Sequence, residues 1–514
     1  MAAKQRRYVV VPDDNIFNDR METTSFHLFH DMHKHLYGRG GPGILSRPLT
    51  EASDEGEAPP TCPRGRIMQT EVGRIRLLDS LDLNEASLVA MTPDQAFELA
   101  RCYPGLRIRP ELFLYPLRHG LPNLIRQQSN PASFRSKRSL SLRCVDSVTG
   151  APVVGADVII VLNGRKGIGI ADIRTDADGR IKTALPAAQS VIEAVICSPL
   201  SGYWPAQAVD VEVLDSGDTE TTLPLVPIAE GFSDAVDRML APAGALDGQG
   251  VRVAVIDTGV SPAQGINVVR GLNTTGTEPA DEWFDNGAGH GTHVAGIVSR
   301  IAPAAEIHAY RVFEKDRGGA SEFAIARAIR QAVEDGCDLI NLSLGQSSEP
   351  ISISREVRRA RAMGVVCIAA AGNDYMSPVS YPARSGVVMA VTAAGVLDAW
   401  PEGAMTGRSI AEKPAPVGDA FFASFSNIGP EVDFIGPGVG IISWVSEQAK
   451  GVMDGTSMAC PAVAGLFARL LSGQPEVLNM DRDQQRSDDI IRMANAKARP
   501  IGFGKEYEGA GLIE

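Results

Sequence analysis

Residues 251–260 read VRVAVIDTGV, an apolar run that ends in an aspartate followed by Thr-Gly. The apolar runs Leu339–Leu342 and Val365–Ala370 have the same texture, and the amphipathic stretch Glu322–Ala332 stands before them. Continuously apolar strands that alternate with helices are typical of a parallel sheet covered by helices. We therefore predict an α/β fold, with a doubly wound and mostly parallel sheet in residues 245–514.

Three short stretches of this region carry side chains that together can perform acyl transfer. Asp257 stands at the carboxyl end of the first apolar run, where open α/β sheets place their sites. His290 begins the stretch HGTHVAG, and Ser457 lies in GTSMACP. Each stretch alone is a weak signal, because Gly-Thr-Ser before a helix can be only a cap. Together they have the order Asp, His, Ser, one of three unrelated chain orders of this triad.

The region resembles the subtilisin-like serine protease (subtilase) family. Four blocks carry the resemblance: Asp257-Thr258-Gly259, His290-Gly291-Thr292-His293, Ala370-Ala371-Gly372-Asn373 and Gly455-Thr456-Ser457-Met458-Ala459. They stand in the family's order and extend the similarity over residues 249–514. The resemblance implies a subtilisin-like fold and a serine endopeptidase that hydrolyses peptide bonds.

The resemblance also implies a role for each polar residue. A serine hydroxyl is a poor nucleophile at neutral pH, so Ser457 needs a general base. His290 would take its proton and later deliver it to the leaving amine, while Asp257 orients the imidazole and stabilises its charged form. The Asn373 side chain and the Ser457 backbone N–H would donate to the oxyanion. A helix that starts at Ser457 would add its dipole to the same field.

The substrate backbone is expected to lie between two segments that resemble family strands. Ser343-Leu344-Gly345 would pair with the peptide on one side, and Gly318-Gly319 would lie on the other. Such pairing adds the peptide to a sheet edge, and glycines let two backbones approach closely. The alternative is that these glycines only make turns.

Two histidine groups raise the question of a metal. His290 and His293 have an i, i+3 spacing, but a third ligand is not evident, and the resemblance explains His293 as a packing residue. Many subtilases also carry a calcium-binding insertion after the helix of His290, whereas here 298–303 run on directly. We predict no calcium at 298–303 and no cofactor. The second group lacks a completing Cys or acid pattern, and a solvated helix or loop is the alternative: His27, His30, His33 and His35.

Residues 1–120 have the pattern of a small α+β domain. Thr92, Pro93 and Gln95 predict a helix that begins with a capping box and runs to about Cys102. The strand-like stretches around it are Tyr8–Val11, Arg74–Leu78, Ser87–Met91 and Leu106–Leu117.

This domain resembles a subtilase propeptide, an intramolecular partner that assists folding and inhibits the enzyme. Its last strand would lead a tail toward the cleft. If the chain processes itself, we expect the cut between Leu117 and Arg138.

Residues 139–228 contain short strand-like runs with turn signals between them, which predict a small β-sandwich. Asp176–Gly179 predicts a hairpin turn rather than a calcium loop, because Ala187 stands where an EF-hand needs Glu. Residues 121–138 are expected to be a linker. The longer stretch Ala399–Phe421 either shapes substrate access or is a surface loop.

The bulk composition bounds the partners and the compartment. The formal net charge of −13 argues against a nucleic-acid partner, which would need a basic surface. No apolar run is long enough to span a membrane, and the N-terminus lacks the apolar stretch of a Sec signal. The seven cysteines are odd in number and show no paired spacing, so a reducing, cytoplasmic compartment is favoured. Non-classical export stays open.

A peptide or protein substrate is the expected partner. Two other functions use the same residues: a peptide-binding scaffold that keeps the protease fold, or a transpeptidase that works through the same acyl-enzyme. The order of the four blocks does not state which peptides are cut.

Overall fold

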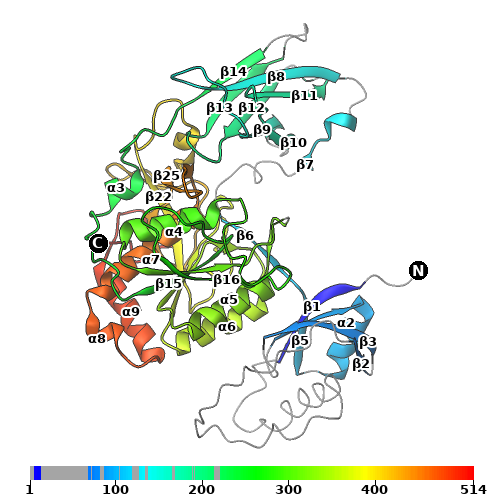
Figure 1. Ribbon diagram of the computed structural model, residues 1–514, viewed down its shortest axis with the longest axis vertical. Helices are drawn as coiled ribbons and strands as arrows, with labels where there is room; N and C mark the ends of the chain where they lie inside the picture. Colours follow the sequence, from blue (N-terminus) through cyan, green and yellow to red (C-terminus); the bar gives the residue numbers. More distant parts are fainter. Residues whose placement is uncertain are drawn as a thin grey trace, which may run out of the picture. The chain divides into compact units, whose positions relative to one another are not determined.

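The computed structural model describes residues 5–12, 67–70, 72–81, 86–103, 105–117, 127–133, 137–164, 168–187, 189, 191–213, 220–315 and 317–514 (Figure 1). The chain forms two compact units. Unit 1 contains residues 1–113 with 321–327 and 350–355, and unit 2 contains the rest. The histidines between 27 and 35 lie outside the described residues.

Unit 1 is built on a five-stranded antiparallel sheet with the order β2-β3-β4-β1-β5. Tyr8, Val10 and Leu77 pack on one face against the helix α2, whereas Val9 and Val11 belong to a second apolar cluster. The sheet therefore has two apolar faces. Its elements are β1 (Arg6–Pro12), β2 (Ile67–Thr70), β3 (Gly73–Ser80), β4 (Ser87–Met91), α2 (Pro93–Cys102) and β5 (Leu106–Pro110).

The predicted capping box of α2 is confirmed. The Thr92 hydroxyl accepts a hydrogen bond from the Gln95 backbone N–H at 3.2 Å, and the Gln95 side chain accepts one from the Thr92 N–H at 3.0 Å. Two backbone donors at the start of the helix are thereby satisfied, which fixes where the helix begins.

The single strand predicted over Leu106–Leu117 is wrong, because the structure has two strands there. β5 ends at Pro110, and β6 covers Phe113–Pro116. Glu111 stands at the break, where its carboxylate accepts a hydrogen bond from the Arg7 guanidinium at 2.8 Å. A sequence pattern of apolar and polar residues continues through such a break, so it does not reveal where the chain changes sheets.

The first part of unit 2 is a β-sandwich of two sheets, β13-β12-β9-β10-β7 and β11-β8-β14, in agreement with the predicted fold class. The Asp176–Gly179 segment makes the expected turn, in which the Gly179 N–H donates to the Asp176 carbonyl at 3.0 Å. The strands are β7 (Gln127–Gln128), β8 (Lys137–Asp146), β9 (Asp157–Asn163), β10 (Ile168–Arg174), β11 (Arg180–Pro186), β12 (Val191–Ser198), β13 (Ala206–Glu212) and β14 (Glu220–Leu225).

The second part of unit 2 is the predicted α/β region, with an eight-stranded sheet in which β16-β17-β15-β19-β21-β22 run parallel. β24 pairs parallel and β23 antiparallel with β22. The strands are β15 (Arg252–Asp257), β16 (Val268–Asn273), β17 (Glu306–Arg311), β19 (Leu339–Leu342), β21 (Val366–Ala370), β22 (Met389–Val396), β23 (Ala420–Phe422) and β24 (Val432–Pro437).

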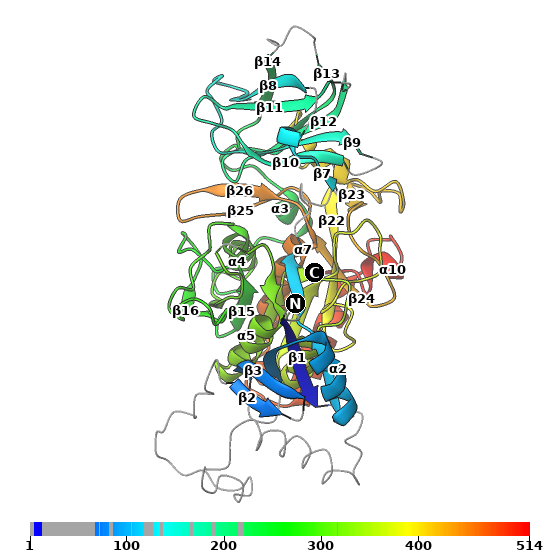
Figure 2. The same cartoon turned by 90° about the vertical axis from the view of Figure 1, so that its right-hand side faces the viewer.

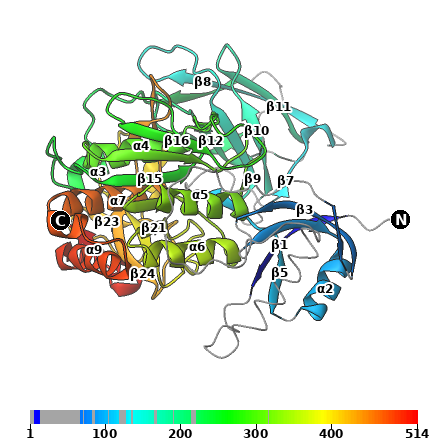
Figure 3. The same ribbon diagram turned by 60° about the horizontal axis from the view of Figure 1, so that its bottom comes forward.

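Helices cover both faces of this sheet. α4 (His290–Ile301) and α7 (Thr456–Ser472) pack into the main apolar core. α4 and the pair α5 (Glu322–Glu334) and α6 (Ile351–Ala362) lie on opposite faces, and α5 and α6 run side by side (Figures 1 and 3). The other helices are α3 (Ala235–Met239), α8 (Pro475–Leu478), α9 (Gln484–Lys497) and α10 (Lys505–Glu508), with 3-10 turns at Pro131–Ser133 and Met405–Ser409.

Short strands complete unit 2. Figure 2 shows the hairpin of β25 (Ile441–Trp444) and β26 (Lys450–Met453), which leads toward Ser457. The remaining strands are β18 (Ala320–Ser321), β20 (Leu344–Gly345), β27 (Ala498–Arg499) and β28 (Leu512–Ile513). None of the described helices is long and apolar enough to cross a membrane.

The sandwich packs on the stretch Ala399–Phe421, for which the sequence left two alternatives open. β9 is apolar on both faces, and Ile159 and Val161 form a cluster against Met405. The Met405 N–H donates to the Pro205 carbonyl at 2.9 Å. A strand that is apolar on both faces must be covered twice, so at least part of this stretch serves as a platform for the sandwich.

Candidate active site

Asp257 and His290 meet at the carboxyl edge of the parallel sheet. Asp257 is the last residue of β15 and His290 the first of α4, and both side chains are buried. His290 Nδ1 lies 2.7 Å from Asp257 Oδ1, which also accepts the Thr258 backbone N–H at 2.7 Å. Because an ionised carboxylate only accepts hydrogen bonds, it places the imidazole proton on Nδ1 and leaves Nε2 as the basic nitrogen.

Ser457 is the second residue of α7, which begins at Thr456, one residue before the predicted start. Its hydroxyl donates to the Ser343 carbonyl at 2.8 Å, and the Ser343 hydroxyl donates back to the Ser457 carbonyl at 2.9 Å. Within the part of the chain that the structure describes, His290 Nε2 has no hydrogen-bond partner. The serine hydroxyl is thus held in a rotamer that does not engage the histidine.

Asn373 is oriented by the residue that precedes the serine. Its side-chain oxygen accepts the Thr456 backbone N–H at 3.0 Å and the Thr456 hydroxyl at 2.8 Å. The amide nitrogen therefore points the other way, and it donates to the carbonyl oxygen of Leu117. The Ser457 backbone N–H donates to the same oxygen at 3.0 Å. Two preplaced donors converge on one carbonyl, as an oxyanion hole requires.

The segment that ends in Leu117 lies along β20 as an added strand. Leu344 pairs with Pro116 and Gly345 with Tyr115, and the pairing is antiparallel. The Leu117 N–H donates to the Ser343 carbonyl at 3.2 Å. A β-carbon on Gly345 would lie 2.8 Å from Leu117 Cδ1, so the glycine makes room for that side chain.

The other predicted substrate segment precedes a strand instead of forming one. β6 lies between β18 and β20, and β18 covers Ala320–Ser321, directly after Gly318 and Gly319. Gly318 has open space around its α-carbon, with nothing within 4 Å of a β-carbon built there. These two glycines therefore lie beside the three-stranded arrangement.

The loop that leads into His290 is held by Asp285. One oxygen of its carboxylate accepts the Thr258 hydroxyl at 2.7 Å, and the other accepts the Gly287 and Gly289 N–H groups, both at 2.8 Å. The Thr258 hydroxyl in turn accepts the Gly291 N–H at 2.8 Å. Burial raises the pKa of Asp285 above its ordinary value. These bonds fix the first turn of α4 relative to Asp257.

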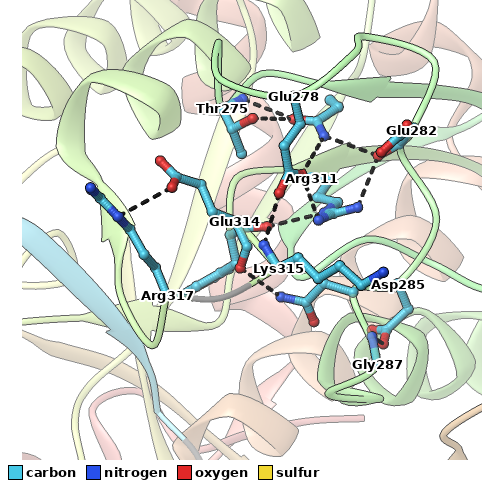
Figure 4. A network of polar contacts seen from close by, with 12 residues as sticks. Thr275, Glu278, Glu282, Asp285, Gly287, Arg311, Glu314, Lys315 and Arg317 are labelled. Carbon is cyan, nitrogen blue, oxygen red and sulfur yellow. Dashed lines mark hydrogen bonds and ion pairs between the residues drawn. The ribbon is translucent and has the colours of Figure 1, made fainter.

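Farther from the cleft, Arg311 braces the same loop (Figure 4). Its guanidinium donates to Glu278 at 2.6 Å and to the Glu282 carbonyl at 3.1 Å. Glu278 also accepts the Lys315 backbone N–H at 2.9 Å. Charge-assisted bonds to a half-buried carboxylate hold this loop in one arrangement.

His293 and the stretch 298–303 both make hydrogen bonds within the protein. His293 is buried, and its Nε2 lies 3.0 Å from the Ile441 carbonyl, which can only accept, so that nitrogen carries the proton. In the stretch 298–303, Arg300 donates to both carboxylate oxygens of Asp234 at 2.8 Å. The described residues hold no group of three or more His, Cys, Asp or Glu that could bind a metal ion.

A cavity of about 990 Å³ lies along α4, with Ser299, Trp444 and Lys450 in its wall. None of the triad residues lines it. The candidate active site is instead the place where Leu117 is bound, because polar groups converge there on a carbonyl oxygen.

The structure brings together the four catalytic candidates that the sequence analysis named, Asp257, His290, Ser457 and Asn373. The sequence analysis did not identify the residues that surround them. Thr456 and Asp285 orient them, yet a threonine before the serine and an aspartate five residues before the histidine carry no signal of their own. Leu117 was predicted as the end of a strand and as the start of the range in which self-cleavage is expected.

Comparison with known proteins covers the α/β region. Residues 248–504 match the subtilase family. The chain is similar to a thermostable alkaline protease of Halalkalibacterium halodurans, 34% identical over 275 residues, which are 52% of this chain and 66% of that protein. It is also similar to subtilisin BL of Lederbergia lenta, 34% identical over 264 residues, 49% of this chain and 88% of that protein. Subtilisin Savinase of the same organism matches equally, at 34% identity.

Proposed function

Since the chain belongs to the subtilase family and is a subtilisin-like serine endopeptidase, we propose that it hydrolyses peptide bonds through an acyl-enzyme on Ser457. His290 is the general base and acid, Asp257 orients it, and Asn373 completes the oxyanion hole. One observation carries the proposal: the Leu117 carbonyl accepts from both Ser457 N–H and Asn373 while Asp257 holds the buried His290 at 2.7 Å.

The reaction begins with a rotation of the Ser457 side chain. Its hydroxyl leaves the Ser343 carbonyl and donates to His290 Nε2, which takes the proton as Oγ attacks the substrate carbonyl. The developing negative charge on the carbonyl oxygen is stabilised by the two donors that already face Leu117. Because Asp257 keeps the proton of the imidazole on Nδ1, the ring becomes positively charged beside a carboxylate.

Collapse of the tetrahedral intermediate breaks the peptide bond. His290 gives its proton to the leaving amine, and the acyl group stays on Ser457. A water molecule then adds to the acyl carbon with His290 again as base, which releases the acid and restores the hydroxyl. The acyl side of the substrate is expected to pair with Ser343, Leu344 and Gly345 as Leu117 does, with Gly318 and Gly319 near its other edge.

We also propose that the first substrate is the chain itself. The Leu117 carbonyl occupies the position of an acyl carbonyl, so the bond between Leu117 and Arg118 is the scissile bond. Cleavage there divides the chain into a propeptide of residues 1–117 and an enzyme of 118–514, which keeps the sandwich of 139–228. Leu117 makes a leucine the preferred residue on the acyl side.

Covalent labelling with a fluorophosphonate tests the proposed function. The processed protein should be labelled at Ser457 and should hydrolyse a peptide p-nitroanilide that ends in leucine. Ser457→Ala should do neither. A folded, processed wild type that takes no label would favour a peptide-binding scaffold, and transfer of the acyl group to an added amine in preference to water would favour a transpeptidase.

A further inference from the structure

The bound Leu117 segment divides the cleft into two sides. The acyl side is the edge of β20, where residues 115–117 are paired. The leaving group must depart beside His290, since that imidazole returns the proton to the amine. The wall next to the first residue of α4 is therefore the wall that meets the residues after the scissile bond.

Two apolar side chains and a backbone carbonyl, that of Val445, lie close to the residue before His290 in this wall. Gly289, directly before His290, has a φ of 71°, and a β-carbon on it would lie 2.9 Å from Val445 Cβ and 3.4 Å from Leu200 Cδ1. Val445 is buried and belongs to the segment after β25. Leu200 belongs to the sandwich, in the connection between β12 and β13. A residue of the sandwich thus lies beside the residue that precedes the general base.

The connection that carries Leu200 is fixed to the β25–β26 hairpin. The Gly202 N–H donates to the Lys450 carbonyl at 2.9 Å. Trp204 is 1% exposed and packs with Ile442 and Val452 of the hairpin. The Leu200 carbonyl oxygen would lie 2.3 Å from a β-carbon on residue 451, so only a glycine fits beneath it. Leu200 is held in place by backbone contacts rather than by burial of its own side chain.

The Leu200 side chain stays 44% exposed although its backbone is anchored. An exposed leucine by itself is ordinary. Here the leucine lies next to Gly289, the residue that precedes His290, in company with the buried Val445. An apolar substrate side chain placed against Leu200 would remove apolar area of both side chains from water. A charged substrate side chain placed there would lose part of its hydration.

We propose that the β-sandwich forms part of the substrate site, and that Leu200 makes an apolar subsite for a side chain in the first three positions after the scissile bond. The preferred substrates are peptides with an aliphatic or aromatic residue there. This inference rests on the proposed peptidase function. It also gives the sandwich a function in the enzyme that remains after cleavage at Leu117.

Two substrate types separate the two sides of the cleft. A leucine p-nitroanilide has no amino acid after the scissile bond and reports the acyl side alone. Internally quenched peptides with leucine or aspartate at each of the three following positions report the leaving-group side. The variants are Leu200→Asp, Leu200→Lys and the matched control Val148→Asp, whose site is 78% exposed on another turn of the sandwich.

Leu200→Asp should lower kcat/KM for the leucine peptides about tenfold, the scale of a lost apolar pocket contact, and leave p-nitroanilide hydrolysis within twofold. Leu200→Lys should raise the relative rate on the aspartate peptides, and Val148→Asp should change nothing. An unchanged leucine-to-aspartate ratio in both Leu200 variants, with normal p-nitroanilide hydrolysis, overturns the inference alone. A wild type that hydrolyses neither substrate overturns the proposed function and the inference with it.

Discussion

The acyl side and the leaving-group side of this cleft are built by different means. Ser343, Gly345 and Asn373 hold the Leu117 segment mainly through hydrogen bonds to its backbone, and all three belong to the α/β region. The other side includes Leu200, which the sandwich brings next to Gly289. Backbone pairing accepts many sequences, so the acyl side supplies the general machinery and the sandwich supplies what is particular to this chain.

The largest effect should come from the machinery that both sides share. His290→Ala removes the base, and kcat should fall by about 10⁶-fold, the loss for triad members in subtilisin, a relative of this chain. The loss should be equal for the p-nitroanilide and for peptides, because the base acts on either substrate. A loss confined to peptides would mean that His290 works only with the leaving group.

Trp204→Ala removes the side chain that packs the sandwich against the β25–β26 hairpin. Truncating a buried tryptophan typically costs about 3–5 kcal/mol, and Trp204 is 1% exposed against the hairpin that leads to Ser457. The free energy of unfolding, measured by denaturant titration in a Ser457→Ala background to prevent self-digestion, should drop by that amount. Exposed Leu246, 69% accessible, gives the control Leu246→Ala. Equal stability of the two variants would show that the sandwich is not anchored at Trp204.

Asn373→Ala removes one oxyanion donor. The expected loss in kcat is about 10²–10³-fold, or about 2.7–4 kcal/mol, with little change in KM, since the donor acts on developing charge. Thr456→Val should produce part of this loss, because it deletes the hydroxyl that holds the Asn373 side-chain oxygen. A KM effect without a kcat effect would assign Asn373 to ground-state binding.

Asp454, three residues before Ser457, forms a hydrogen bond with the stretch Ala399–Phe421 on which the sandwich packs. Substitution of Asp454 should have the smallest effect. Its carboxylate accepts the Gly440 N–H at 2.6 Å and the Ser409 hydroxyl at 3.3 Å, and burial raises its pKa to about 6. Between pH 4 and 6 the folded chain then keeps a proton that the unfolded chain has released. The stabilisation from this group is therefore full below pH 4, falls between pH 4 and 6, and is gone above pH 6.

The slope from one such proton is at most about 1.4 kcal/mol per pH unit. Asp454→Asn should flatten the fall in unfolding free energy between pH 4 and 6, whereas Asp281→Asn on the exposed surface should not. Burial also raises the pKa of Asp433 to about 6, so part of the slope remains in the variant. An unchanged slope in Asp454→Asn would exclude this carboxyl as a source.

The α/β fold could be predicted from sequence because apolar runs such as Val251–Ile256 are long, and buried parallel strands have a strong signature. The catalytic candidates could be identified from sequence for another reason: Asp257, His290, Ser457 and Asn373. Asp257, His290 and Ser457 lie at the end of a strand or the start of a helix, and Asn373 follows the end of β21 by three residues, so each local motif also marks a position in the fold.

The remaining residues could not be predicted, because they depend on contacts between distant segments. Leu200 and Gly289 are far apart in the chain, and nothing in either segment indicates the other. The break between β5 and β6 likewise coincides with a contact between distant residues, Arg7 and Glu111. The role of Ala399–Phe421 became clear only from its packing against the apolar outer face of β9, a contact between segments far apart in the chain.

The intact mass of the purified wild type, measured beside Ser457→Ala, tests whether Ser457 cleaves its own chain after Leu117. The wild type should appear as two chains, residues 1–117 and 118–514, and Ser457→Ala should remain one chain of 514 residues. A wild type cut at another bond would contradict the assignment of Leu117 to the acyl position. Equal processing of Ser457→Ala would contradict the nucleophile itself.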